Sequence, residues 1–165
     1  MVDLKEFEQK AADLRVLGMK ISIGQDTVYE KYWDEDCRRN IYSASKSFTS
    51  CAVGFAVQEG LIDLDERLMD AFKEDIPNNP DENLKKATVK DLLTMTLGQE
   101  KGFLMGKQRP RMEEQNWVKA SLAISFVYEP GTHFVYNNVG PYLAGILVQR
   151  RAGCDLLSYL TPRLL

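Results

Sequence analysis

The chain has 165 residues, of which 44% are hydrophobic and 27% are charged, and its formal net charge is −3. These values are typical of one soluble domain with a sizeable core. There is no basic run interleaved with aromatic residues, which argues against a nucleic-acid surface. No apolar stretch is long enough to cross a bilayer, and the N-terminal segment is too charged for a signal peptide, so we expect a cytoplasmic protein without membrane contact.

Metal-ligating residues are few and scattered. The three cysteines (Cys37, Cys51 and Cys154) are widely spaced and include no Cys-x-x-Cys pair, and His133 is the single histidine. This pattern favours free thiols and argues against a zinc site. We therefore expect neither a metal nor another cofactor.

The first forty residues predict a helix followed by a β-hairpin. Residues 3–17 place apolar side chains at helical spacing, and residues 19–23 alternate between apolar and polar. Residues 24–26 are typical of a turn, and residues 27–33 are rich in β-formers. A two-stranded hairpin is at best marginal on its own in water, so the sheet looks incomplete.

Beyond Ser43 the apolar period changes to that of helices, and most of the remaining chain is predicted to be helical. Glycine is expected just past two of these helices, and Thr88 and either Asp63 or Asp65 are expected to cap others. The predicted helices are 44–59 closed by Gly60, a short one ending at Phe72, 89–96 before Gly98, 116–125, 139–152 and 155–164, with loops at 76–82 and 101–115 and a short extended piece at 132–136.

Ser43 and Lys46 form the pattern Ser-x-x-Lys, which occurs once in the chain. Such a short pattern arises by chance on the order of once per chain of this length, so its surroundings decide its meaning. Ser43 falls in the first turn of a predicted helix, and Lys46 lies three residues further on the same face. The uncharged run that follows predicts a helix that is buried nearly all round.

A lysine in this position is unfavourable for stability. Its positive charge interacts unfavourably with the helix dipole, at a cost of roughly 0.3–1 kcal/mol, and burying the ammonium without a partner costs more free energy. A catalytic interpretation explains the placement, because a desolvated lysine can help to deprotonate the hydroxyl of Ser43. In the alternative interpretation Ser43 only caps the helix and Lys46 extends into solvent.

Tyr136 and Asn138 belong to the only Tyr-x-Asn pattern of the chain, directly before a predicted helix. In a functional interpretation the phenol lies beside Ser43 and Lys46. The positive charge then lowers the tyrosine pKa, and a phenolate can accept the serine proton. Asn138 hydrogen-bonds the substrate or orients Lys46. In the alternative interpretation Tyr136 packs and Asn138 caps the helix.

These segments resemble a known family. Residues 43–49, the apolar helix after them and residues 59–65 resemble the nucleophile region of class C β-lactamases and related penicillin-binding proteins. Residues 89–98 look like the family's next helix and turn, and residues 130–140 resemble its tyrosine segment. Two positions differ, since Met95 and Leu97 stand where the family usually has a histidine and a serine.

The resemblance implies an α+β, mainly helical fold of the β-lactamase/transpeptidase type. Residues 1–40 would supply a helix and a hairpin of the sheet region, and residues 41–165 a mostly helical region of the same partial domain. It also implies a serine hydrolase that cleaves an amide or ester of a small molecule through an acyl-enzyme. Ser43 would be the nucleophile, Lys46 and Tyr136 its proton-handling partners, and Asn138 a substrate-binding residue.

The family's Lys-Thr-Gly-like strand, which supplies substrate contacts and part of the oxyanion hole, has no counterpart here. Together with the incomplete sheet, this predicts the front part of a longer enzyme that lacks its C-terminal strands. We expect the chain by itself to turn over slowly or not at all, since losing one oxyanion donor typically costs about 10²–10³ in rate. A complementary C-terminal fragment or self-association through open sheet edges would complete the sheet.

Two other functions stay open. One is a Ser-His-Asp hydrolase that uses His133, although no Gly-x-Ser-x-Gly segment is present. The other is a non-catalytic module that binds a ligand or partner on the same fold.

Overall fold

The computed structural model describes residues 3–35 and 37–164. Residues 1, 2, 36 and 165 lie outside this description, and with them the first residues of the charged N-terminal segment. The chain divides into two compact units, residues 1–41 and residues 42–165. None of the described helices combines the length and the hydropathy that a bilayer crossing requires.

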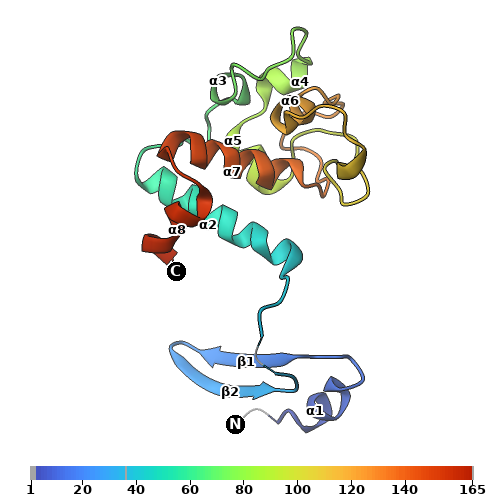
Figure 1. Ribbon diagram of the computed structural model, residues 1–165, viewed down its shortest axis with the longest axis vertical. Helices are drawn as coiled ribbons and strands as arrows, with labels where there is room; N and C mark the ends of the chain where they lie inside the picture. The colour runs from blue at the N-terminus through green and yellow to red at the C-terminus, as the bar shows by residue number, and fades with distance from the viewer. Residues whose placement is uncertain (1–2, 36, 165) are drawn as a thin grey trace. The chain divides into compact units, whose positions relative to one another are not determined.

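The first unit consists of one helix and the predicted hairpin. Its elements are α1 (Lys5–Ala11), β1 (Gly18–Ile23) and β2 (Asp26–Tyr32), and the two strands pair antiparallel from Gly18↔Tyr32 to Ile23↔Asp26 (Figure 1). Glu8 of α1 contacts the hairpin, because it accepts hydrogen bonds from Tyr29 at 2.7 Å and from Lys31 at 2.6 Å. The predicted helix over residues 3–17 is too long. It ends at Ala11, and Arg15 has a φ of +53°, which a continuing helix does not allow.

The second unit is helical, as the sequence predicts. Its elements are a 3₁₀ turn η1 (Tyr42–Ala44), α2 (Ser45–Gln58), α3 (Leu68–Ala71), α4 (Glu82–Lys86), α5 (Val89–Thr94), a 3₁₀ turn η2 (Arg109–Arg111), α6 (Trp117–Leu122), α7 (Val139–Ala152) and α8 (Leu156–Leu164). With the hairpin, these elements make an α+β, mainly helical fold.

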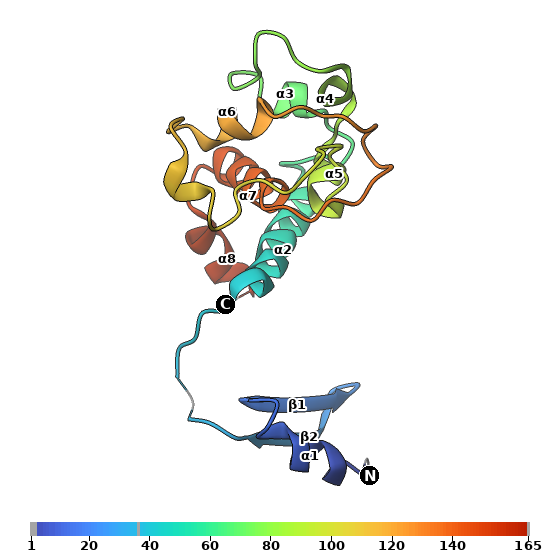
Figure 2. The same ribbon diagram turned by 90° about the vertical axis from the view of Figure 1, so that its right-hand side faces the viewer.

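Helix α7 is the centre of this unit. It packs against both α2 and α5, and α8 folds back onto α2 and α7 (Figures 1 and 2). Leu143, Ala144 and Val148 of α7 are completely buried, as are Ala52 and Ala56 of α2. The hydrophobic core therefore holds the segment that contains Ser43 and the segment that contains Tyr136 in one body.

The predicted cap of the short helix is wrong. Helix α3 begins after Arg67 without a side-chain cap, and Asp63 instead accepts a hydrogen bond from the Asp65 amide in a turn. Helix α4 is an additional element, which follows directly after a segment rich in proline and asparagine. Residues 132–136 lie outside any paired strand, and the Val135 amide donates to the Met95 carbonyl at 3.0 Å.

Candidate active site

Ser43 lies in the 3₁₀ turn that leads into α2. The turn begins at Tyr42, whose φ of +46° is unusual for a residue other than glycine, and the Ser45 hydroxyl donates to the Tyr42 carbonyl at 2.7 Å. The helix cap is Ala44, and no side chain makes a capping hydrogen bond there. The Ser43 hydroxyl is therefore not used as a cap, which excludes that alternative interpretation.

Lys46 and Tyr136 both contact the Ser43 hydroxyl oxygen. The Lys46 amine donates a hydrogen bond to Ser43 Oγ at 3.1 Å, and the Tyr136 phenol oxygen lies 2.7 Å from the same atom. The Lys46 amine is 5.2 Å from the centre of the Tyr136 ring. The fold thus brings together a hydroxyl, an amine and a phenol from segments 93 residues apart.

The site is more exposed than the predicted burial of Lys46 and its helix implies. Ser43 is exposed, Lys46 is half-buried, and Tyr136 is 44% exposed. Helix α2 buries only one face, and Cys51 and Gly54 on its other side are exposed, so the prediction of a helix buried nearly all round is wrong. Apolar composition alone does not bury a helix, since burial also needs a neighbouring element on each face.

The contacts of Tyr136 change its acidity. The hydrogen bond with the Ser43 hydroxyl is the largest cause, followed by the hydrogen bond with Lys46, and together with the smaller effect of the Lys46 charge they favour the phenolate and hold the pKa of Tyr136 below the ordinary value. Partial burial acts in the opposite direction but is the smaller effect. A phenolate at this place can accept a proton from the serine hydroxyl.

Backbone contacts hold the Tyr136 segment in place. Besides the bond from Val135 to Met95, the Asn138 amide donates to the Phe103 carbonyl at 3.2 Å. A side chain at Gly102 would approach the Tyr136 carbonyl to 2.7 Å, so only glycine permits this close contact. Met95 thus supports the segment through its carbonyl, a role that does not depend on its side chain.

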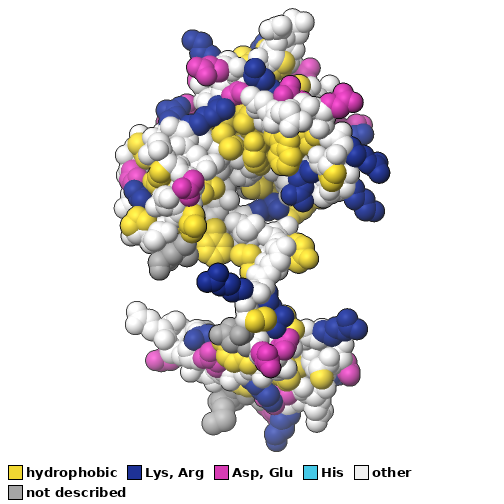
Figure 3. Space-filling model, viewed as in Figure 1, with side chains coloured by type: hydrophobic (Ala, Val, Ile, Leu, Met, Phe, Trp, Pro, Cys, Tyr) yellow, Lys and Arg dark blue, Asp and Glu magenta, His cyan; other side chains and the backbone are white. Residues whose placement is uncertain are grey.

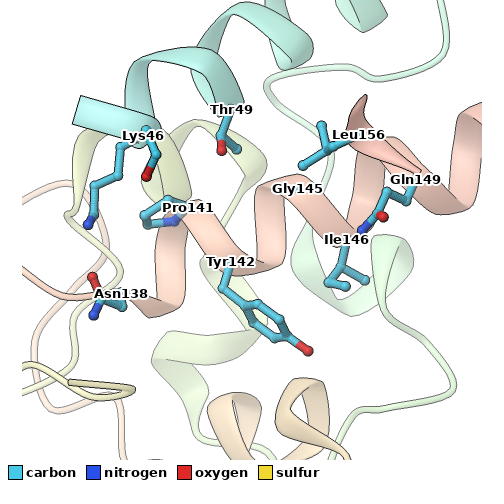
Figure 4. Close-up of a pocket in the computed structure, with 10 residues that line it drawn as sticks. Lys46, Thr49, Asn138, Pro141, Tyr142, Gly145, Ile146, Gln149 and Leu156 are labelled. Atoms are coloured by element: carbon cyan, nitrogen blue, oxygen red, sulfur yellow. The ribbon is translucent and has the colours of Figure 1, made fainter. Parts of the chain in front are cut away.

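The two asparagines after Tyr136 have different roles. Asn137 is buried, and its side-chain oxygen accepts from the Gly140 amide at 3.1 Å in the first turn of α7. Asn138 makes no capping bond, and its side-chain amide donates to the Leu104 carbonyl at 2.9 Å. This contact leaves the Asn138 side-chain oxygen on the side of the Lys46 amine (Figure 4). The helix is therefore capped by Asn137 and not by Asn138.

His133 takes part in a different cluster. Its ring stacks on Tyr128 with centroids 4.2 Å apart, and its Nδ1 lies 2.8 Å from the Thr132 hydroxyl. Neither contact involves Ser43. Within residues 3–35 and 37–164, no group of three or more potential ligands is arranged to hold a metal ion, and the three cysteines are exposed thiols.

A pocket of about 290 Å³ adjoins the site between α2 and α7. Lys46 and Asn138 line one end of it, and Gln149 and Leu156 line the other (Figure 4). Gln149 and Leu156 are not among the residues predicted from the sequence motifs. Both belong to helices whose positions the sequence predicts, but no motif marks residues that become neighbours only through helix packing.

Comparison with known proteins identifies the family and the fold. The β-lactamase family model matches residues 5–165. Among solved structures, the octameric penicillin-binding protein homologue from Pyrococcus abyssi is similar with a TM-score of 0.74 and 24% identity over 99% of this chain and 42% of that one. A class C β-lactamase has a TM-score of 0.75 and 18% identity, and the match covers 98% of this chain and 46% of that one. A simvastatin synthase mutant from Aspergillus terreus has a TM-score of 0.62 and 23% identity, and the match covers 96% of this chain and 46% of that one.

The fold is that of the β-lactamase-family hydrolases, and the chain belongs to the β-lactamase family. It spans less than half the length of each of these three structures. Their names cover a penicillin-binding protein homologue, a lactamase and a synthase, so the shared fold is compatible with more than one reaction.

Proposed function

We propose that this chain carries the nucleophilic centre of a serine hydrolase that cleaves an amide or ester bond through an acyl-enzyme on Ser43. The observation that carries the proposal is the joint contact of Lys46 and Tyr136 with the Ser43 hydroxyl oxygen, at 3.1 and 2.7 Å. A nucleophile and its base within hydrogen-bond distance are what acyl transfer by a serine requires.

In the proposed reaction Ser43 Oγ forms a bond to the carbonyl carbon, and the Tyr136 phenolate accepts the hydroxyl proton. The bond to the leaving group then breaks, and Tyr136 returns the proton to the departing nitrogen or oxygen. Water repeats the sequence to release the acyl group. The Lys46 cation stabilises the phenolate, and Asn138 contacts the substrate.

Two features support these roles. The pKa of Tyr136 is lowered by the residues that the mechanism needs beside it. The Ser43 and Lys46 side chains, moreover, have no capping or solvent-extended role that would explain them structurally, because Ala44 occupies the cap position and the amine is hydrogen-bonded to Ser43.

Covalent labelling tests the proposal with the full 165-residue chain. A fluorophosphonate reacts in one step with an activated serine, and peptide mass spectrometry locates the adduct. We expect a single label on Ser43. In Lys46→Met and in Tyr136→Phe the labelling rate should fall by about 10²–10⁴, the usual contribution of a positioned acid or base.

Ser47 is a matched control, since it is an exposed serine on the same helix. Ser47→Ala should label like the parent chain, and circular dichroism should show that every variant is folded. No adduct on Ser43, or equal rates in the parent and Lys46→Met, would contradict the proposal and favour the non-catalytic binding module.

A further inference from the structure

Three consecutive residues between α5 and α6 contact the segment that carries Tyr136. The Phe103 carbonyl accepts a hydrogen bond from the Asn138 backbone amide at 3.2 Å, and the Leu104 carbonyl accepts one from the Asn138 side-chain amide at 2.9 Å. Gly102 packs so closely that a Cβ atom there would lie 2.7 Å from the Tyr136 carbonyl oxygen. The shape of this stretch therefore determines where the Tyr136 segment lies.

Residues 102–105, which we call the support loop, belong to no helix or strand. Leu104 has a φ of +55°, a conformation that leucine rarely adopts, and it is only 2% exposed. A residue in such a conformation keeps it only when the surrounding structure holds it there. The support loop therefore needs contacts from outside itself.

Gln108 supplies such contacts through its side chain. Its Oε1 accepts a hydrogen bond from the Met105 backbone amide at 2.9 Å, and its Nε2 donates to the Gly102 carbonyl at 3.4 Å. The Gln108 backbone amide also donates to the Met105 carbonyl at 2.8 Å. A single side chain thus joins the two ends of the support loop.

Gln108 is turned inward, unlike its neighbours in the sequence. Lys107 and Arg109 are exposed, whereas Gln108 is half-buried. Figure 3 shows Lys and Arg side chains on the right-hand surface of the second unit, where Figure 1 places the chain between α5 and α6. The polar atoms of Gln108 therefore serve the support loop and not the charged surface around it.

We infer that Gln108 is a positioning residue, which fixes the support loop and through it holds Tyr136 and Asn138 in place at the candidate active site. This inference rests on the proposed function, because positioning has an effect on rate only if Tyr136 takes part in the reaction at Ser43. The side-chain hydrogen bonds of Gln108 go to the backbone of the support loop, so it acts through other residues.

The test begins with Gln108→Met in the full chain. Methionine keeps the length of the side chain and removes both of its hydrogen-bonding atoms. Labelling of Ser43 by the fluorophosphonate should slow by about 10- to 100-fold, because a displacement of about 1 Å at a catalytic group can cost about 10²-fold in rate. Circular dichroism should show that the variant is folded.

The titration of Tyr136 separates positioning from a general loss of stability. A phenol that moves away from Ser43 and Lys46 loses the contacts that favour its phenolate. Carbon-13 NMR of tyrosine Cζ should therefore show a higher Tyr136 midpoint in Gln108→Met than in the parent chain. A loss of stability alone would not move the midpoint of the folded protein.

Two further variants complete the series. Gln108→Glu keeps an acceptor for the Met105 amide, so it should label faster than Gln108→Met. Gln115→Met is the matched control, since Gln115 is an exposed glutamine between α5 and α6 whose side-chain amide donates to the Glu113 carbonyl at 3.3 Å. It should label like the parent chain, with the same Tyr136 midpoint.

Parent-like labelling of Gln108→Met, or slower labelling without a change of the Tyr136 midpoint, would overturn the inference. Gln108→Glu that labels no faster than Gln108→Met would also contradict it. If Lys46→Met still slowed labelling in either case, the proposed function would stand. If Ser43 were not labelled in the parent chain, the proposed function would fall, and an unchanged Tyr136 midpoint in Gln108→Met would show separately that Gln108 does not position the phenol.

Discussion

At the scale of single residues, the chemistry of the candidate site depends on how Ser43, Lys46 and Tyr136 share protons. The phenol and the amine both hydrogen-bond to the same serine oxygen, at 2.7 and 3.1 Å. Since the site is partly exposed to water, the hydrogen bonds between these groups affect the pKa of Tyr136 more than desolvation does. The acidity of Tyr136 is therefore the quantity that a measurement should address.

We expect Tyr136 to titrate below the ordinary tyrosine value of about 10. Because Ser43 and Lys46 favour the phenolate, removing either partner should raise the midpoint. Carbon-13 NMR of tyrosine Cζ, assigned through Tyr136→Phe, should show the Tyr136 midpoint rising in Ser43→Ala and in Lys46→Met. Labelling of Ser43 should in turn become faster as the pH rises through this lowered pKa, since the phenolate is the proposed base.

Tyr29 serves as an internal reference in the same spectra. Burial and its hydrogen bond to Glu8 raise the pKa of Tyr29 to about 12. It should titrate well above Tyr136 and should not respond to changes at Ser43. A Tyr136 midpoint at or above 10 would contradict the proposed role of the phenol.

At the scale of secondary-structure elements, the close crossing of α5 and α7 holds the Tyr136 segment near α2. Gly140 makes this crossing possible, since a Cβ atom there would lie only 2.2 Å from the Leu92 carbonyl oxygen. Neither helix can shift easily, because Leu92 and Leu143 are completely buried in the core between them.

Gly140→Ala should therefore lower the free energy of unfolding by about 1–3 kcal/mol, the usual cost of overpacking. Gly54→Ala is the matched control. Gly54 lies in the interior of α2, and apart from its chain neighbours and the backbone of its own helix no atom lies within 4 Å of an added Cβ, so alanine should stabilise the protein by about 0.5–1 kcal/mol. Urea unfolding followed by circular dichroism measures both. Equal effects of the two substitutions would contradict the close contact.

Elements with strong local signals were predictable from the sequence. Helix α7 spans residues 139–152 as predicted, and the predicted cap Thr88 forms a capping box with Asp91. Asn116, at the start of a predicted helix, accepts hydrogen bonds from the first turn of α6. The long helix predicted over residues 3–17 failed, because its apolar spacing continues past the point where the backbone turns at Arg15.

At the scale of the whole molecule, the two units differ in how many of their residues are buried. Among residues 3–35 and 37–41, only Ala11 is buried, whereas the core of the second unit extends from Ala52 to Leu160. Local stability follows buried apolar contacts. The hairpin should therefore open far more often than helices α2 and α7, which follow Ser43 and Tyr136.

Hydrogen exchange on the full chain tests this difference. Amides of β1 and β2 should exchange at least about 100-fold faster than amides in the interior of α7, which report the global stability. Equal protection of the hairpin and α7 would contradict the expectation. Protection of the hairpin that increases with protein concentration would support the predicted self-association through its open edges.

The sequence by itself determined most of the helices, the hairpin and the membership of the β-lactamase family, because periodicity, capping residues and ordered motifs are local properties of the chain. It also singled out Ser43, Lys46 and Tyr136 as candidates. Only the tertiary structure decided that the phenol reaches the serine oxygen across 93 residues, that Lys46 is half-buried and paired, and that Gln149 lines the same pocket as Lys46. Those properties arise where separate helices pack together, and contacts between residues distant in sequence leave no pattern in any one segment.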